Sequence, residues 1–118
     1  MDTDQSAITV QRRPDATVLC LDGRIDAEAD LPLRAALDDA LATPTPRLVL
    51  DFSRLTYMNS TGIALVVGIL GRARASGTPI AAFGLSDHYR EIFRITRLAD
   101  FLPVFESEAD ARAGLAVT

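Results

Sequence analysis

The sequence predicts an α/β fold: a mostly parallel sheet of about five strands that opens with an antiparallel hairpin, with about four helices mainly on one face. Two apolar runs near the N-terminus flank a turn, and short apolar runs then alternate with segments of helical spacing. A length of 118 residues with 48% hydrophobic content suits one domain, residues 1–118. Because parallel crossovers are right-handed, consecutive strands place their helices on one face and their following loops at the carboxyl edge.

Turn and helix-breaking residues organise the first half of the chain. Pro14 and Asp15 provide turn chemistry between two apolar runs, which therefore form the hairpin. Pro32 is tolerated only in the first turn of the leucine-rich helix that follows, and Pro44 and Pro46 end that helix. The expected elements are a loose tail at 1–5, strands around 8–10 and 18–21, an irregular segment at 22–26, a helix at 31–42 and a buried strand at 48–50.

Capping residues organise the second half. Asn59 is a favourable N-cap, and Ser76-Gly77 is a typical helix end. Ser86 is placed to cap a third helix, and Ser107 begins a capping box before a terminal helix. The expected elements are a helix at 60–75, strands at 80–83 and 104–105, a helix after residue 86 and a helix ending near residue 115.

Composition excludes several classes of function. All 12 basic residues are arginine, and the net charge of −4 argues against a nucleic-acid partner. No apolar run is long enough for membrane insertion and no secretory signal is seen, so we expect a cytoplasmic protein. The single cysteine, Cys20, is interpreted as buried filler. His88 is the only histidine and has no evident nucleophile beside it, and no phosphate-binding glycine loop occurs, so we expect no enzyme activity, no metal and no cofactor.

The helix at 60–75 has two dissimilar faces when its residues are placed at 100° intervals. The large apolar side chains are predicted to face the sheet: Ile63, Val66, Ile69, Leu70 and Ala73. The opposite stripe is small, where charged residues are usual: Ser60, Ala64, Gly68, Gly71 and Ala75, with Arg72 beside them. Two glycines inside a helix cost roughly 1 kcal/mol each, which suggests a packing reason. Two interpretations remain open, a partner-docking surface or tight packing against the sheet or a neighbouring helix.

The start of that helix is the candidate site. Asn59 can cap the first turn, Ser60 then presents its hydroxyl outward, and Gly62 leaves space in which another molecule could approach the backbone amides. The helix dipole favours negative charge at this position. We interpret the segment as a docking and modification site, and the alternative is an ordinary capped helix.

The chain resembles the STAS domain of bacterial anti-sigma factor antagonists. The resemblance rests on the segments Leu48-Val49-Leu50-Asp51-Phe52-Ser53, Tyr57-Met58-Asn59-Ser60-Thr61-Gly62-Ile63 and Ala82-Phe83-Gly84-Leu85-Ser86. It implies that the unmodified protein binds an anti-sigma factor, usually a serine kinase, and so frees a sigma factor. It also implies that the kinase phosphorylates Ser60, that the complex then dissociates, and that a serine phosphatase resets the switch. We expect partner contacts at Asn59, Ser60, Thr61, Gly62, Ala64, Gly68 and Gly71.

Two positions depart from the family pattern. Asn59 stands where the family usually has aspartate before the phosphorylated serine. Arg97 replaces a glycine near the end of the third helix, which implies strain if the backbone there is left-handed. Asn59 favours an alternative reading: a STAS-type binding or scaffold module of a signalling or transporter complex that is never phosphorylated.

Overall fold

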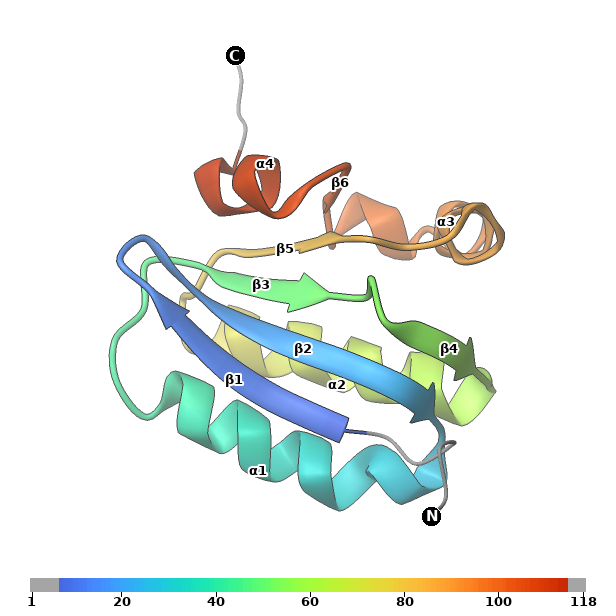
Figure 1. Cartoon of the computed structure of the whole chain (residues 1–118), viewed down its shortest axis with the longest axis horizontal. Coiled ribbons are helices and arrows are strands. Elements are labelled where there is room, and N and C mark those ends of the chain that lie inside the picture. The colour runs from blue at the N-terminus through green and yellow to red at the C-terminus, as the bar shows by residue number, and fades with distance from the viewer. Residues whose placement is uncertain (1–6, 115–118) are drawn as a thin grey trace.

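The computed structural model describes residues 7–114, so the tail expected at residues 1–5 lies outside the described part. Figure 1 shows a sheet flanked by helices. The strands are β1 (Ala7–Arg13), β2 (Ala16–Ile25), β3 (Leu48–Asp51), β4 (Leu55–Met58), β5 (Ile80–Phe83) and β6 (Val104–Phe105). The helices are α1 (Asp30–Leu41), α2 (Ser60–Ala75), α3 (Asp87–Ile95) and α4 (Glu108–Ala113), with short 3-10 helices η1 (Ala27–Ala29) and η2 (Leu98–Asp100).

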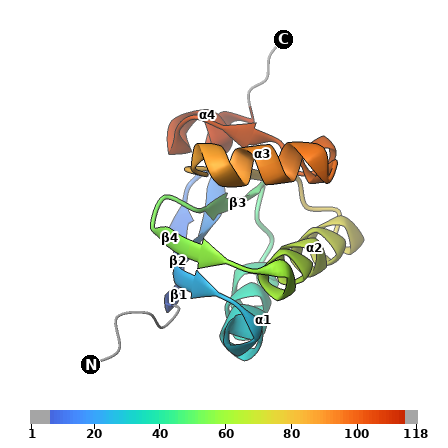
Figure 2. The same ribbon diagram turned by 90° about the vertical axis from the view of Figure 1, so that its right-hand side faces the viewer.

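The sheet confirms the predicted topology. Its strand order is β1-β2-β3-β5-β6, with β1 antiparallel to β2 and every other pairing parallel. Apart from β4, each strand therefore lies beside the one before it, as expected from short right-handed crossovers. The loops that follow the parallel strands meet at one end of the sheet, which faces the viewer in Figure 2.

A sixth strand was not predicted. β4 pairs with the far end of β2, beyond the point where β3 ends, so β2 continues to Ile25 instead of becoming irregular at residues 22–26. A register shift between Gly23 and Arg24 lets β2 change partner from β3 to β4. The short segment Leu55–Met58 lacks the alternating burial that marks a strand, because its two middle residues are both exposed.

The two faces of the sheet are covered unequally. Alternate residues of a strand point to opposite faces. Leu19 joins the large core that α1, α2 and α3 cover, whereas Val18 joins a smaller cluster with Val49 and with Ala111 of α4. The prediction that the helices lie mainly on one face is confirmed, with α4 as the exception across the sheet (Figure 1). Since α4 follows the last strand, the chain is free to fold back over the opposite face.

Capping and amphipathicity define the helices as the sequence predicted. The side chains of Ser86 and Ser107 accept from the N–H groups of Tyr89 and Asp110, at the starts of α3 and α4. Of the large residues on α2, Val66, Ile69 and Ala73 are buried, and Ile63 and Leu70 are half-buried against the core. None of the helices within residues 7–114 is long and apolar enough to cross a membrane.

Candidate functional site

The first turn of α2 lies at the carboxyl end of the sheet, where β4 runs directly into the helix (Figure 2). Asn59 is the N-cap, and its Oδ1 accepts a hydrogen bond from the Gly62 N–H at 2.9 Å. Ser60 is the first helical residue, and both Ser60 and Thr61 are exposed. The first turn carries no acidic side chain, so nothing there neutralises the positive end of the helix dipole. The predicted cap and the exposed position of Ser60 are confirmed.

Gly62 has a different role from the one predicted. It is buried, and a Cβ at this position would collide with the carbonyl oxygen of Ile25 and lie 2.7 Å from Cγ of Met58. The missing side chain therefore makes room for the end of β2, and the expectation that it opens the turn to another molecule is wrong. Close packing of α2 against the end of β2 fixes the position of Ser60 relative to the sheet.

Tyr89 of α3 holds the residue that precedes the cap. Its buried hydroxyl accepts a hydrogen bond from the Met58 N–H at 2.8 Å and donates one to the Met58 carbonyl at 3.3 Å. A single side chain thus satisfies both backbone groups at the end of β4, which has β2 as its strand neighbour. Sequence reasoning missed this role because Tyr89 also fits the apolar face of α3 and β4 itself was not predicted.

The stripe of small residues on α2 is open to solvent. A Cβ added at Gly68 or at Gly71 would meet no heavy atom within 4 Å, and Ala64 is also exposed. The interpretation that the stripe packs tightly against the sheet or another helix is therefore wrong. Partner docking at these positions stays a prediction.

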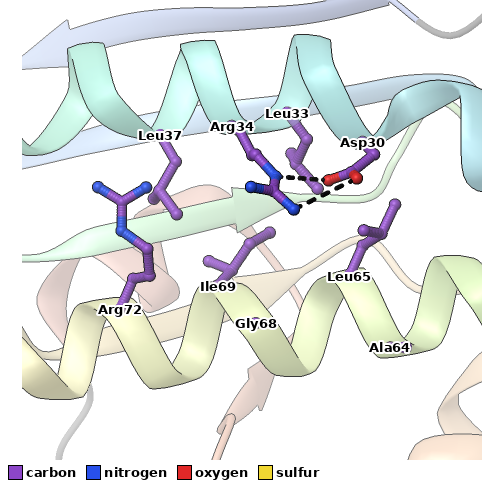
Figure 3. Close-up of a pocket in the computed structure, with 9 residues that line it drawn as sticks. All are labelled: Asp30, Leu33, Arg34, Leu37, Ala64, Leu65, Gly68, Ile69 and Arg72. Atoms are coloured by element: carbon purple, nitrogen blue, oxygen red, sulfur yellow. Dashed lines mark hydrogen bonds and ion pairs between the residues drawn. The ribbon is translucent and has the colours of Figure 1, made fainter.

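Ala64 and Gly68 line a groove of about 350 Å³ between α1 and α2, which we call the α1–α2 groove. Leu33 and Leu37 from α1 face Leu65 and Ile69 from α2 across it (Figure 3). Charges of both signs border the groove. Arg34 Nε donates to Asp30 Oδ1 at 2.8 Å, and Arg72 pairs with Asp38 at 2.8 Å. The groove is thus apolar at its base and electrically balanced along its edges.

The groups that could suggest catalysis are engaged elsewhere. Asp51 accepts from the N–H and the hydroxyl of Ser53, at 2.8 and 2.6 Å, and so closes the turn after β3. Cys20 is half-buried, not fully buried filler, and its Sγ donates to Asp51 Oδ2 at 3.1 Å. Burial, followed by that carboxylate, raises the pKa of Cys20 to about 11, which disfavours a reactive thiolate.

His88 and the remaining acidic residues are the other candidates for catalysis or metal binding. His88 is exposed on α3, against the ring of Tyr89. Residues 7–114 contain no group of three or more histidine, cysteine, aspartate or glutamate side chains placed to hold a metal.

Arg97 confirms the strain that the sequence suggested. It has φ +66°, and among residues 7–114 it is the one residue other than glycine with a positive φ. A left-handed backbone costs a residue with a Cβ on the order of 1 kcal/mol. The side chain forms an exposed ion pair, with Nε 2.7 Å from Asp100 Oδ2.

Together the fold and the site define an α/β domain that presents an exposed, capped serine at the carboxyl end of its sheet. A family model described as "Mlab, STAS domain" matches residues 8–104. Since this is most of the sequence, the chain belongs to the STAS domain family, which confirms the resemblance.

Known proteins agree with that assignment. The chain is 29% identical over 100 residues to an anti-sigma-B factor antagonist of Listeria monocytogenes, covering 85% of this chain and 88% of that protein. An anti-sigma factor antagonist from Mycobacterium paratuberculosis has the same fold, with TM-score 0.83, 20% identity and 96% of both chains covered. So does the Bacillus cell fate determinant SpoIIAA in its phosphorylated form, with TM-score 0.70, 22% identity, and 93% of this chain and 100% of that one covered.

Proposed function

We propose that this protein is a cytoplasmic anti-sigma factor antagonist, a regulator and not an enzyme. In its unmodified form it binds an anti-sigma factor that is also a serine kinase, and so frees a sigma factor. Phosphorylation of Ser60 by that kinase ends the interaction, and a serine phosphatase restores it. The relatives named as anti-sigma factor antagonists support the first part, and the phosphorylated form solved for SpoIIAA supports the second.

The observation that carries the proposal is the position of Ser60. Its hydroxyl is exposed on the first residue of α2, beyond a cap that already occupies the Gly62 N–H. A kinase can therefore reach the hydroxyl without unfolding the helix. The exposed small residues Ala64, Gly68 and Gly71 continue the same face for about 16 Å along α2, at 1.5 Å per residue. We assign the partner's docking surface to this face, together with Asn59 and Thr61.

Electrostatics explains how a phosphate could act as a switch here. A phosphoserine carries about −1.5 to −2 charges, and the dipole of α2 would stabilise that charge by roughly 0.3–1 kcal/mol. The protein's own fold therefore tolerates the modification. A partner that closes over a neutral hydroxyl would instead bury an unpaired dianion, which strongly disfavours the complex. The switch thus acts on binding and leaves the fold unchanged.

The test is a pull-down from cells that express the chain, using wild-type, Ser60→Ala and Ser60→Asp protein as bait, with mass analysis of the wild-type bait. We expect wild type and Ser60→Ala to retain a serine kinase, Ser60→Asp to lose it, and wild type to carry phosphate on Ser60. Thr56→Asp is the matched control, because Thr56 is exposed on β4 and lies outside the docking face on α2. Equal loss of the kinase with Ser60→Asp and with Thr56→Asp would contradict the assignment to Ser60.

A second candidate is a STAS module that binds its partner without being phosphorylated, as part of a signalling or transporter complex. Asn59 favours it, since this amide keeps the cap but lacks the negative charge of aspartate beside the acceptor hydroxyl. Equal recovery of a partner that is not a kinase by all three Ser60 baits, with Ser60 unmodified, would support this alternative.

A further inference from the structure

A second groove lies on the other side of α2, between this helix and η2. It has a volume of about 630 Å³, and we call it the α2–η2 groove. Val67 and Leu70 of α2, Ile80 at the start of β5, and Leu98 and Phe101 around η2 contribute its apolar lining. Of the residues assigned above to the docking face, it contains Gly71 alone.

Exposed apolar side chains occur in and next to this groove. Five large apolar side chains are exposed within residues 7–114, and two of them, Val67 and Phe101, line this groove at 50% and 60% exposure. A third, Ile95, is 62% exposed and precedes the lining residue Thr96. Clustered exposed apolar side chains beside a groove are typical of a protein interaction surface.

The charged residues that line the α2–η2 groove are all basic. Arg74 and Arg97 line it, and no lining residue is acidic, although acidic residues outnumber basic ones in the chain by 16 to 12. Arg74 forms no ion pair with any residue of the 7–114 segment, and Arg97 is held by an exposed pair with Asp100. In the α1–α2 groove both arginines have acidic partners, whereas in the α2–η2 groove only Arg97 has one, so the α2–η2 groove is the one that favours an anionic ligand, through Arg74 first.

We propose that the α2–η2 groove binds an amphipathic helix of a protein partner, with an apolar face flanked by carboxylates. The apolar face would cover Val67, Leu70 and Phe101, and the carboxylates would pair with the guanidinium groups of Arg74 and Arg97. Helices commonly bind in this way, through apolar anchors spaced along one side. Aromatic and arginine side chains are also enriched at protein interfaces. The inference does not depend on phosphorylation, because Ser60 lies outside the groove.

Two designed helical peptides with the same leucine spacing test the proposal, one flanked by glutamate and the other by lysine. Each is titrated into ¹⁵N-labelled protein while amide shifts are followed by NMR. We expect the glutamate peptide to shift amides around Val67–Arg74 and Leu98–Phe101, and to bind at least about tenfold more tightly than the lysine peptide. The double variant Arg74→Glu/Arg97→Glu should lose this preference, while Arg34→Glu in the α1–α2 groove should keep it.

Several outcomes would overturn the proposal. These are equal binding of both peptides, shifts confined to the α1–α2 groove, or no shifts up to about 1 mM peptide. Saturable binding of dodecanoate without binding of the glutamate peptide would assign the groove to a small apolar anion instead. Ser60→Asp should bind the glutamate peptide as wild type does, so this experiment and the kinase pull-down can fail independently.

Discussion

Replacing Tyr89 by phenylalanine isolates the contact that holds the candidate site in place. The change keeps the ring in the core and removes only the hydroxyl that bonds both backbone groups of Met58. Leaving a buried polar group without a hydrogen bond costs on the order of 1–3 kcal/mol. We therefore expect a loss of about 2 kcal/mol in the free energy of unfolding. At roughly 4 °C per kcal/mol for a domain of this size, the melting temperature should fall by about 8 °C.

Urea unfolding followed by far-UV circular dichroism measures this loss, and the other tyrosine of the chain provides the control. Tyr57 is 42% exposed, and the guanidinium of Arg24 lies over its ring at 4.8 Å. Phenylalanine keeps that ring, so Tyr57→Phe should change stability by less than about 0.5 kcal/mol. Amide hydrogen exchange gives a local readout, since Tyr89→Phe should expose the Met58 N–H preferentially.

Equal stability of the two variants would refute the role given to the Tyr89 hydroxyl. A loss of stability without faster exchange at Met58 would instead indicate a general packing effect, and Tyr89 would no longer be a support of the site.

Two further predictions concern glycines and the cysteine. Gly62→Ala should destabilise the protein by more than about 2 kcal/mol, because the new Cβ collides with the Ile25 carbonyl. Gly68→Ala should instead stabilise it by about 0.5–1 kcal/mol, because the new Cβ meets no other atom. Thermal melts compare the two variants, and similar melting temperatures would contradict the packing described. The pKa of Cys20 is about 11 against an ordinary 9.0, so the folded state holds the thiol proton more tightly than the unfolded state does. The contribution of the protonated thiol to stability is therefore complete below pH 9 and is lost as the pH rises through 11. The rate of Cys20 alkylation against pH should show this raised midpoint, and Asp51→Asn should lower it; a midpoint near 9 would refute the environment described.

Local signals were sufficient for most of the fold. Asn59, Ser86 and Ser107 define helix starts through contacts within three residues of themselves, so the sequence shows them directly. The strand β4 could not be predicted in this way, because it is stabilised by β2 and by Tyr89, which lie far away in the chain. Strands that depend on distant partners carry weak local patterns.

The site was predicted in its chemistry but only partly in its packing. The exposed hydroxyl of Ser60 followed from the cap, whereas the burial of Gly62 depends on the carbonyl of Ile25, a contact between distant segments. The left-handed backbone at Arg97 was predictable because a family resemblance supplied the expected residue at that position.

The two ends of the sheet bear on how the protein could aggregate. Within residues 7–114, β1 and β6 each have one strand neighbour, so each leaves an edge on which another chain could add a strand. β6 has only two residues, too few to template a partner strand. β1 carries Arg12 and Arg13, which pair with Asp39 and Glu108 and would bring charge into any strand added beside them. Growth by adding strands at β1 or at β6 is therefore disfavoured, and at the end of β4 the Tyr89 hydroxyl already occupies both backbone groups of Met58.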